Sequence, residues 1–144
     1  MSGRDSTAYL LVRVGGRRVG LALAHVVEVL DPGVAHPVPS VEPAVRGVAQ
    51  VRGRVLPVIH LGALLDGLPC PAIRGEAAVL VELEGRRLCL EVDEAEIVSR
   101  EFGLPVPPET AMPWAVAVAR HPEGLVPLLD LSALGTRMSE APTR

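Results

Sequence analysis

Apolar residues alternate with other residues at the start of the chain. Every second position is apolar from Leu10 to Val14 and again from Val19 to Leu23, and two consecutive glycines lie between these runs. A period of two is typical of a β-strand with one buried face, and glycine tolerates the positive φ of a tight turn. The pattern therefore predicts a β-hairpin that opens the fold.

The same pattern returns in the second half of the chain, which indicates an internal repeat. Gly16-Arg17-Arg18, in residues 10–29, aligns without a gap with Gly85-Arg86-Arg87, in residues 79–98. Further on, residues 56–61 (LPVIHL) align with residues 126–131 (VPLLDL), and an Ala-Leu pair follows each stretch. Two matches in the same order and at nearly the same spacing are hard to obtain by chance. The chain is therefore interpreted as two copies of one unit.

The repeat suggests one domain, residues 8–135, made of unit 1 at about 8–66 and unit 2 at about 77–135. Residues 67–75 contain two prolines and are the predicted linker. Polar segments flank the domain and are expected to be flexible tails: residues 1–7 and 136–144.

Each unit continues beyond its hairpin in the same way. A short segment, residues 24–30 or 93–99, is expected to be one helical turn or a bend, and a proline-rich stretch follows it as loops and edges. Two strands then close each unit. Five short strands in about 60 residues favour a small closed or nearly closed barrel, since closure removes exposed edges. A barrel of that size is marginal alone, so the two should pack together, and their seam is a candidate binding surface.

Composition limits the classes of function. The chain has 144 residues, 49% of them hydrophobic, and a net charge of −3 with no lysine. That charge argues against a nucleic-acid-binding surface, which needs a basic excess. The start has no apolar signal-peptide region, and no apolar run approaches the length of a membrane span. Two cysteines do not make a disulfide scaffold, so a reduced cytoplasmic protein is expected.

The sequence gives little evidence for a catalytic, metal-binding or phosphate-binding site. None of the four histidines has a metal-ligand spacing with another histidine or with a cysteine, and no glycine-rich phosphate motif occurs. Cys89 is expected to be a small apolar residue on a packed strand face. The carboxylates clustered around residues 82–96, Glu91 among them, are interpreted as a solvated face. We therefore expect no catalytic residue, no metal and no cofactor; the rival class is a small hydrolase or metal enzyme using Cys89 or His60.

Residues 47–61 (GVAQVRGRVLPVIHL) resemble the CheW family segment GVxNLRGxxxPVxDL. Val19-Gly20-Leu21 and Val26-Val27-Glu28-Val29 resemble the strand and the VxEV-like segment that precede it in this family. Val92-Asp93 and residues 128–131 (LLDL) resemble its later motifs. The set, in order, spans about residues 8–135, nearly the whole chain.

This resemblance implies an all-β fold of two tandem five-stranded SH3-like β-barrels packed side by side, with short helical turns. It also implies a non-catalytic cytoplasmic adaptor of chemosensory arrays. Its partners would be the signalling tip of a chemoreceptor (a methyl-accepting chemotaxis protein) and the regulatory domain of a CheA-type histidine kinase. Neither nucleic acid nor direct membrane insertion is expected. The positions that match the receptor-side contact are Leu10, Leu23, Val26, Glu28, Val29, Arg46 and Arg52.

Three residues depart from the family pattern. Gln50-Val51 stands in place of Asn-Leu, and His60 stands where the family has Asp, which unit 2 keeps as Asp130. Two alternatives therefore stay open: a diverged accessory protein that binds a receptor or another partner without coupling to a kinase, and an unrelated SH3-like peptide-binding module.

Overall fold

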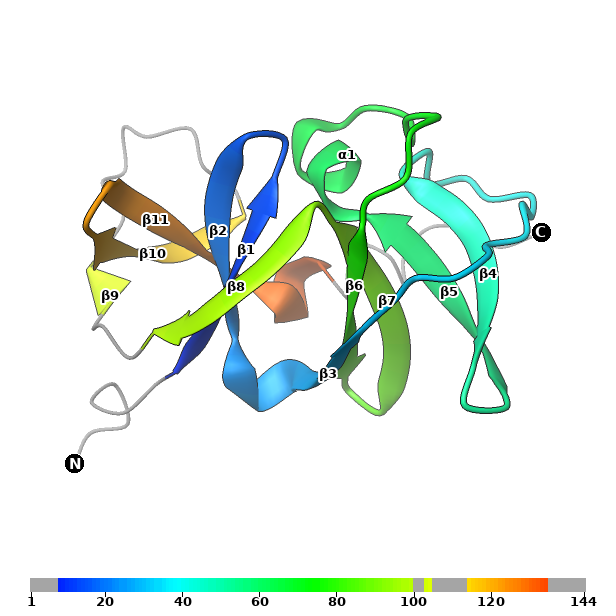
Figure 1. The fold of residues 1–144 in the computed structure, drawn as a ribbon, viewed down its shortest axis with the longest axis horizontal. Helices are drawn as coiled ribbons and strands as arrows, with labels where there is room; N and C mark the ends of the chain where they lie inside the picture. Colours follow the sequence, from blue (N-terminus) through cyan, green and yellow to red (C-terminus); the bar gives the residue numbers. More distant parts are fainter. Residues whose placement is uncertain (1–7, 100–102, 105–113, 135–144) are drawn as a thin grey trace.

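The strands of the computed structural model form two sheets that lie side by side (Figure 1). The structure describes residues 8–99, 103–104 and 114–134, of which residues 131–134 are helical. The other elements, in chain order, are β1 (Tyr9–Val14), β2 (Arg17–Ala22), a 3₁₀ turn (Leu23–His25), β3 (Val26–Leu30), β4 (Val45–Val51), β5 (Arg54–His60), α1 (Leu61–Asp66), β6 (Ala77–Leu83), β7 (Arg86–Val92), β8 (Glu94–Ser99), β9 (Gly103–Leu104), β10 (Ala115–His121) and β11 (Gly124–Leu129).

The predicted hairpins are present as β1–β2 and β6–β7, and residues 67–75 contain neither helix nor strand. The expectation of a helical turn or bend at residues 24–30 and 93–99 is wrong for most of both segments, which form β3 and β8. Distant partners specify these strands, because β3 pairs with β6 and β8 pairs with β1. The tails predicted at residues 1–7 and 136–144 lie outside the described residues.

The two sheets do not divide the chain at the linker. One sheet has the strand order β8-β1-β2-β11-β10-β9, and the other has the order β3-β6-β7-β5-β4 (Figure 1). Each half of the chain thus gives its opening hairpin to the sheet that the other half completes. The exchanged hairpins are held by parallel pairing, β2 with β11 and β7 with β5. Apart from the short β9, the two sheets have the same strand order once matching elements are exchanged.

The exchanged hairpins are buried on both faces. One cluster of buried residues joins the two sheets and includes Val12, Leu21, Val81 and Leu90. On the other face of β6 and β7, Leu80 and Cys89 help to form a second core together with residues of β4 and β5. Double burial explains why these strands contain long apolar runs rather than a strict alternation.

At one pair of matching positions in the two sheets, a larger side chain on one strand faces a smaller residue on the other. Cys89 pairs in register with Val58 in one sheet, and Gly20 pairs with Leu128 in the other. A Cβ atom on Gly20 would lie 2.5 Å from a methyl carbon of Leu128, so the larger leucine requires the smaller partner. Cys89 is therefore a small core residue, as predicted.

The chain that follows β3 closes its own sheet. His36 forms an antiparallel bridge with Val48 on β4: His36 N donates to Val48 O at 2.7 Å, and Val48 N donates to His36 O at 2.9 Å. Because β3 and β4 are the two edges of this sheet, the bridge connects its ends. At Gly47, with φ of 153°, a Cβ atom would lie 2.1 Å from His36 O. Only glycine allows this crossing.

We predict that Gly47→Ala lowers the free energy of unfolding by about 2–5 kcal/mol, because it adds both a backbone strain and a clash with His36. Gly53→Ala is the matched control: its φ is 80°, but an added Cβ meets nothing within 4 Å. The control should cost only about 1–2 kcal/mol. Urea unfolding of both variants checks this, and equal losses would contradict the role assigned to the crossing.

Candidate functional site

The edge strand β3 presents an exposed apolar surface. Val27 and Val29 are 41% and 46% exposed, whereas Val26 and Leu30 are partly buried and pack against different cores. The pairing with β6 shifts register between Val26 and Glu28, so that Val26 lies over the core between the sheets and Leu30 over the core of its own barrel. We call Val27 and Val29, together with the Glu28–Arg52 ion pair described next, the β3 surface.

An ion pair with two hydrogen bonds crosses from the β4–β5 turn to β3. Arg52 Nε donates to Glu28 Oε2 at 2.6 Å, and Nη2 donates to Oε1 at 2.7 Å. Arg52 is held in the turn with φ of 51°, and its side chain is 72% exposed. The hydrogen bonds from Arg52 keep the pKa of the Glu28 carboxyl below its usual value. The pair is a preformed charged site that a partner can reach.

The other predicted receptor-side residues lie deeper. Leu10 belongs to the core that joins the sheets, and Leu23 and Val26 are partly buried against it. Leu23 N donates to Ala8 O at 2.8 Å, which ties the start of β1 to the turn before β3. These three residues therefore lie in or against the core that joins the sheets and are not part of the β3 surface.

Arg46 is used inside the molecule. Its Nε donates to Glu91 Oε1 at 2.7 Å, and Nη2 donates to Ile73 O at 3.2 Å. Glu91 has no exposed surface, and its other oxygen accepts from Gly75 N at 2.8 Å. The interpretation of Glu91 as part of a solvated face is therefore wrong. We call this arrangement of Arg46, Glu91 and the linker residues Ile73 and Gly75 the linker clamp.

The linker clamp was missed by the sequence reasoning, although a signal was present. Glu91 interrupts the apolar run of β7, and a charge in a strand buried on both faces needs a partner. Gly75 gives a second reason for the close approach: a Cβ atom there would lie 2.3 Å from Val92 O.

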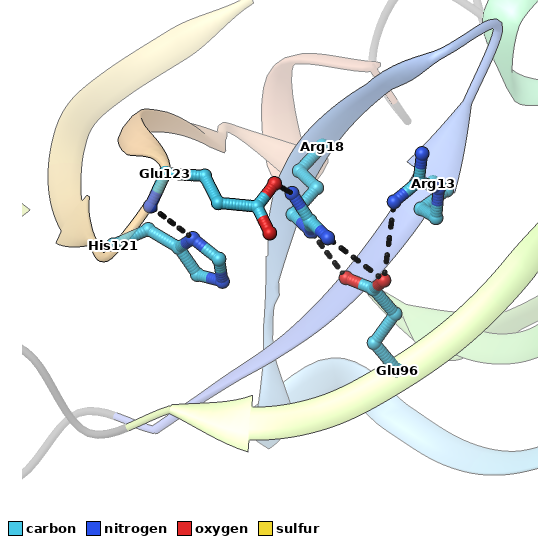
Figure 2. Close-up of polar contacts among 5 residues, drawn as sticks. All are labelled: Arg13, Arg18, Glu96, His121 and Glu123. Carbon is cyan, nitrogen blue, oxygen red and sulfur yellow. Dashed lines mark hydrogen bonds and ion pairs between the residues drawn. The ribbon is translucent and has the colours of Figure 1, made fainter.

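A second charged network closes the other sheet (Figure 2). Arg18 on β2 donates through Nε to Glu96 Oε1 at 2.7 Å and through Nη1 to Glu123 Oε1 at 2.6 Å. Arg13 lies 3.6 Å from the same Glu96. The hydrogen bonds to the two glutamates raise the pKa of Arg18 and lower the pKa values of Glu96 and Glu123. The repeated Gly-Arg-Arg thus supplies a cation that connects β2, β8 and the β10–β11 turn.

Two surface cavities flank the sheets. One, of about 330 Å³, lies between the β1–β2 and β10–β11 turns and is lined by polar and apolar residues alike, with Arg17, Arg18 and His121 among them. The other, of about 250 Å³, is mostly apolar and lies over β4 and β5, where Val38 and Val41 are exposed. We call the second cavity the β4 groove. Its remaining lining comprises Pro39, Ser40, Glu42, Val45, Gly47, Val48, Pro57, Ile59, Arg86, Arg87 and Leu88.

Neither cysteine thiol lies in an environment that favours the reactive thiolate. Cys89 is buried, and burial raises the pKa of its thiol, with the negative charge of Glu28 adding to the effect. Burial also raises the pKa of Cys70. Within the described residues, no three His, Cys, Asp or Glu side chains are grouped so that they could hold a metal ion. In the same part of the chain, no helix is long and apolar enough to cross a membrane.

Known proteins match this chain in family and in fold. A family model described as CheW-like domain matches residues 8–137. No curated protein matches the chain. Among solved structures, the crystal structure of the scaffolding protein TtCheW from Thermoanaerobacter tengcongensis superposes with a TM-score of 0.76. The two chains are 20% identical, and the match covers 90% of this chain and 87% of that one. The match confirms the predicted fold class of two SH3-like barrels.

We predict that Arg46→Met lowers the free energy of unfolding by about 3–5 kcal/mol, because it leaves the buried Glu91 carboxylate without its cation. Adding Glu91→Gln should restore much of that loss, since the amide oxygen can still accept from Gly75 N. Arg54→Met, on an exposed arginine of β5, should change stability by less than about 0.5 kcal/mol. Denaturant unfolding measures all three; an Arg46→Met protein as stable as the Arg54→Met control would disprove the clamp.

Proposed function

This chain belongs to the CheW-like domain family, and on that premise we propose that it is a non-catalytic signalling adaptor that couples chemoreceptors to a CheA-type histidine kinase. The observation that carries the proposal is that one small chain has two accessible apolar areas, at the β3 surface and in the β4 groove. An adaptor must bind two partners at once, and individually weak contacts add up in an array. The proposed location is the cytoplasm, at receptor arrays.

We assign the receptor tip to the β3 surface. A helical hairpin binds through apolar anchors on one face, and exposed short aliphatic residues such as Val27 and Val29 can accept them. Arg52 adds a guanidinium that is fixed in place by Glu28 and open to solvent, and arginine is enriched among interface hot spots. Of the residues predicted for this contact, Glu28, Val29 and Arg52 are the ones we assign to it directly. Leu10 and Arg46 are engaged within the fold and are not assigned to the contact.

We assign the kinase to the β4 groove. The groove lies over β4 and β5, and no residue of β3 lines it. Its apolar lining, with Val38 and Val41 exposed, suits the edge of another small barrel. Arg86 and Arg87 at its border can select a partner with acidic residues.

The three departures from the family pattern fit this proposal. Gln50 is exposed at the end of β4, and Val51 packs against the core of its barrel. His60 takes over a hydrogen bond that an aspartate makes in the matching position of the second half. Since each substitution is accommodated by the fold, we retain kinase coupling as the proposed role and treat the accessory protein and the peptide-binding module as outcomes of the test.

The proposal is tested by passing cell extract over the immobilised full chain and identifying what it retains. Recovery of both chemoreceptors and a CheA-type kinase supports the adaptor. Receptor without kinase identifies an accessory protein, and recovery of neither overturns the proposal in favour of a peptide-binding module that works outside signalling arrays.

We predict that Arg52→Ala weakens binding of a soluble receptor-tip fragment by about five- to a hundredfold, the scale of a lost charge-assisted contact. The barrels should remain folded, since exposed ion pairs contribute little to stability. Arg54→Ala, which removes an exposed arginine from the same hairpin, is the control and should bind normally. Titration calorimetry gives the affinities. If the Arg52→Ala and Arg54→Ala proteins bind equally well, the receptor surface is assigned wrongly.

The two surfaces should also be separable. We predict that Val29→Glu reduces receptor binding at least about tenfold and spares the kinase, whereas Val41→Glu has the opposite effect, because each places a charge in one apolar contact. Val34→Glu, at an exposed valine outside the lining of the β4 groove, is the control. Pull-down of each partner by the three folded variants checks this, and loss of both partners in one variant would argue against two independent surfaces.

A further inference from the structure

The two helical segments begin with different caps at matching positions. In the first half, Ala63 N donates to His60 Nδ1 at 3.0 Å, and His60 has the extended backbone of an N-cap residue. In the second half, Ala133 N donates to Asp130 Oδ1 at 3.1 Å. Both side chains satisfy a backbone N–H three residues ahead, one of the donors that a helix start leaves free.

These caps respond differently to protons. A carboxylate keeps its acceptor oxygens throughout the range in which imidazole changes charge, between about pH 5 and 8. A neutral imidazole has a single acceptor nitrogen, and a protonated one has none. A proton on Nδ1 of His60 would place two donors face to face, so the cap of α1 exists only with the neutral ring.

The acidic groups on the elements packed against His60 have other partners. The backbone N–H of His60 donates to Ala44 O, and α1 lies so close to the ring that a Cβ atom on Gly62 would be 3.2 Å from His60 Cε1. Glu91 on β7 pairs with it in register, but both oxygens of that carboxylate are already engaged in the linker clamp. On α1 itself, the charged residue is Asp66, at the far end and paired with Arg17.

Helix α1 connects the two sheets (Figure 1). It follows β5 directly in one sheet, and Asp66 pairs at 2.7 Å with Arg17 on β2 of the other sheet. Trp114 Nε1, just before β10 in that second sheet, donates to Leu65 O at 3.1 Å. A loosened start of α1 is therefore expected to weaken these contacts between the sheets.

We propose that His60 makes the junction between the two barrels sensitive to protons. At neutral pH the imidazole caps α1 and holds the junction firm; in mild acid it is protonated, the cap is lost and α1 loosens against both sheets. The matching helical turn in the second half keeps its cap, so the response is confined to one side. Because the cap requires an unprotonated Nδ1, its contribution to stability is lost as the pH is lowered.

The test compares full-length wild type with His60→Asp by urea unfolding at pH 7.5 and pH 5.5. In wild type, the unfolding equilibrium constant should rise with acid by a factor about two- to thirtyfold larger than in the variant, the range expected for one N-cap. The other three histidines remain in both proteins, including His121, whose Nδ1 also accepts a backbone N–H, so their contribution cancels. An equal acid response in the two proteins would overturn the proposal.

Trp114 gives a separate readout without denaturant. It is the single tryptophan of the chain and is hydrogen-bonded to the end of α1 opposite His60. Its fluorescence should shift between pH 7.5 and 5.5 in wild type and stay constant in His60→Asp. The protection of the Ala63 amide from hydrogen exchange should drop over the same range, while that of Ala133 does not. A drop at Ala63 without a change at Trp114 would confine the effect to the cap and refute its transmission to the junction.

Discussion

Parallel pairing of each opening hairpin with strands from the other half of the chain is the constraint on which this structure depends. Strand β2 joins β11, and β7 joins β5, so neither sheet is complete without residues from both sides of the linker. The exchange buries both faces of the hairpins, one in a barrel and one in the shared core. It provides the apolar area that a barrel of about 60 residues lacks on its own.

The exchange of hairpins also explains where ion pairs occur in the fold. The linker must return across β7 to start the second half, and the linker clamp of Arg46, Glu91 and Gly75 holds it there. Ion pairs also connect strands that are not neighbours in each sheet, Glu28 with Arg52 in one and Arg18 with a glutamate of β8 in the other. The buried pair stabilises the fold only while it is complete, whereas the exposed pair at Arg52 remains available to a partner.

Function is proposed where the barrels leave surface uncovered. Strand β3 leaves Val27 and Val29 in solvent, and the β4 groove lies over β4 and β5 of the same sheet. In both places the strands are held by pairing with their neighbours, which favours binding without large reorganisation. Helix α1 adds contacts between the two barrels, and in our proposal their stability depends on the protonation of His60.

The sequence by itself determined the local elements and the class of fold. Alternation and paired glycines located the hairpins, the two matched segments revealed the repeat, and the motif around Gly47 and Arg52 indicated the family. Only the tertiary structure decided that residues 26–30 form a strand, that Glu91 is buried, that Arg46 is engaged within the fold and that His60 caps a helix. The physical reason is that periodicity reports which face of an element is apolar, whereas a strand partner, a counter-ion or a cap is supplied by residues brought near by folding.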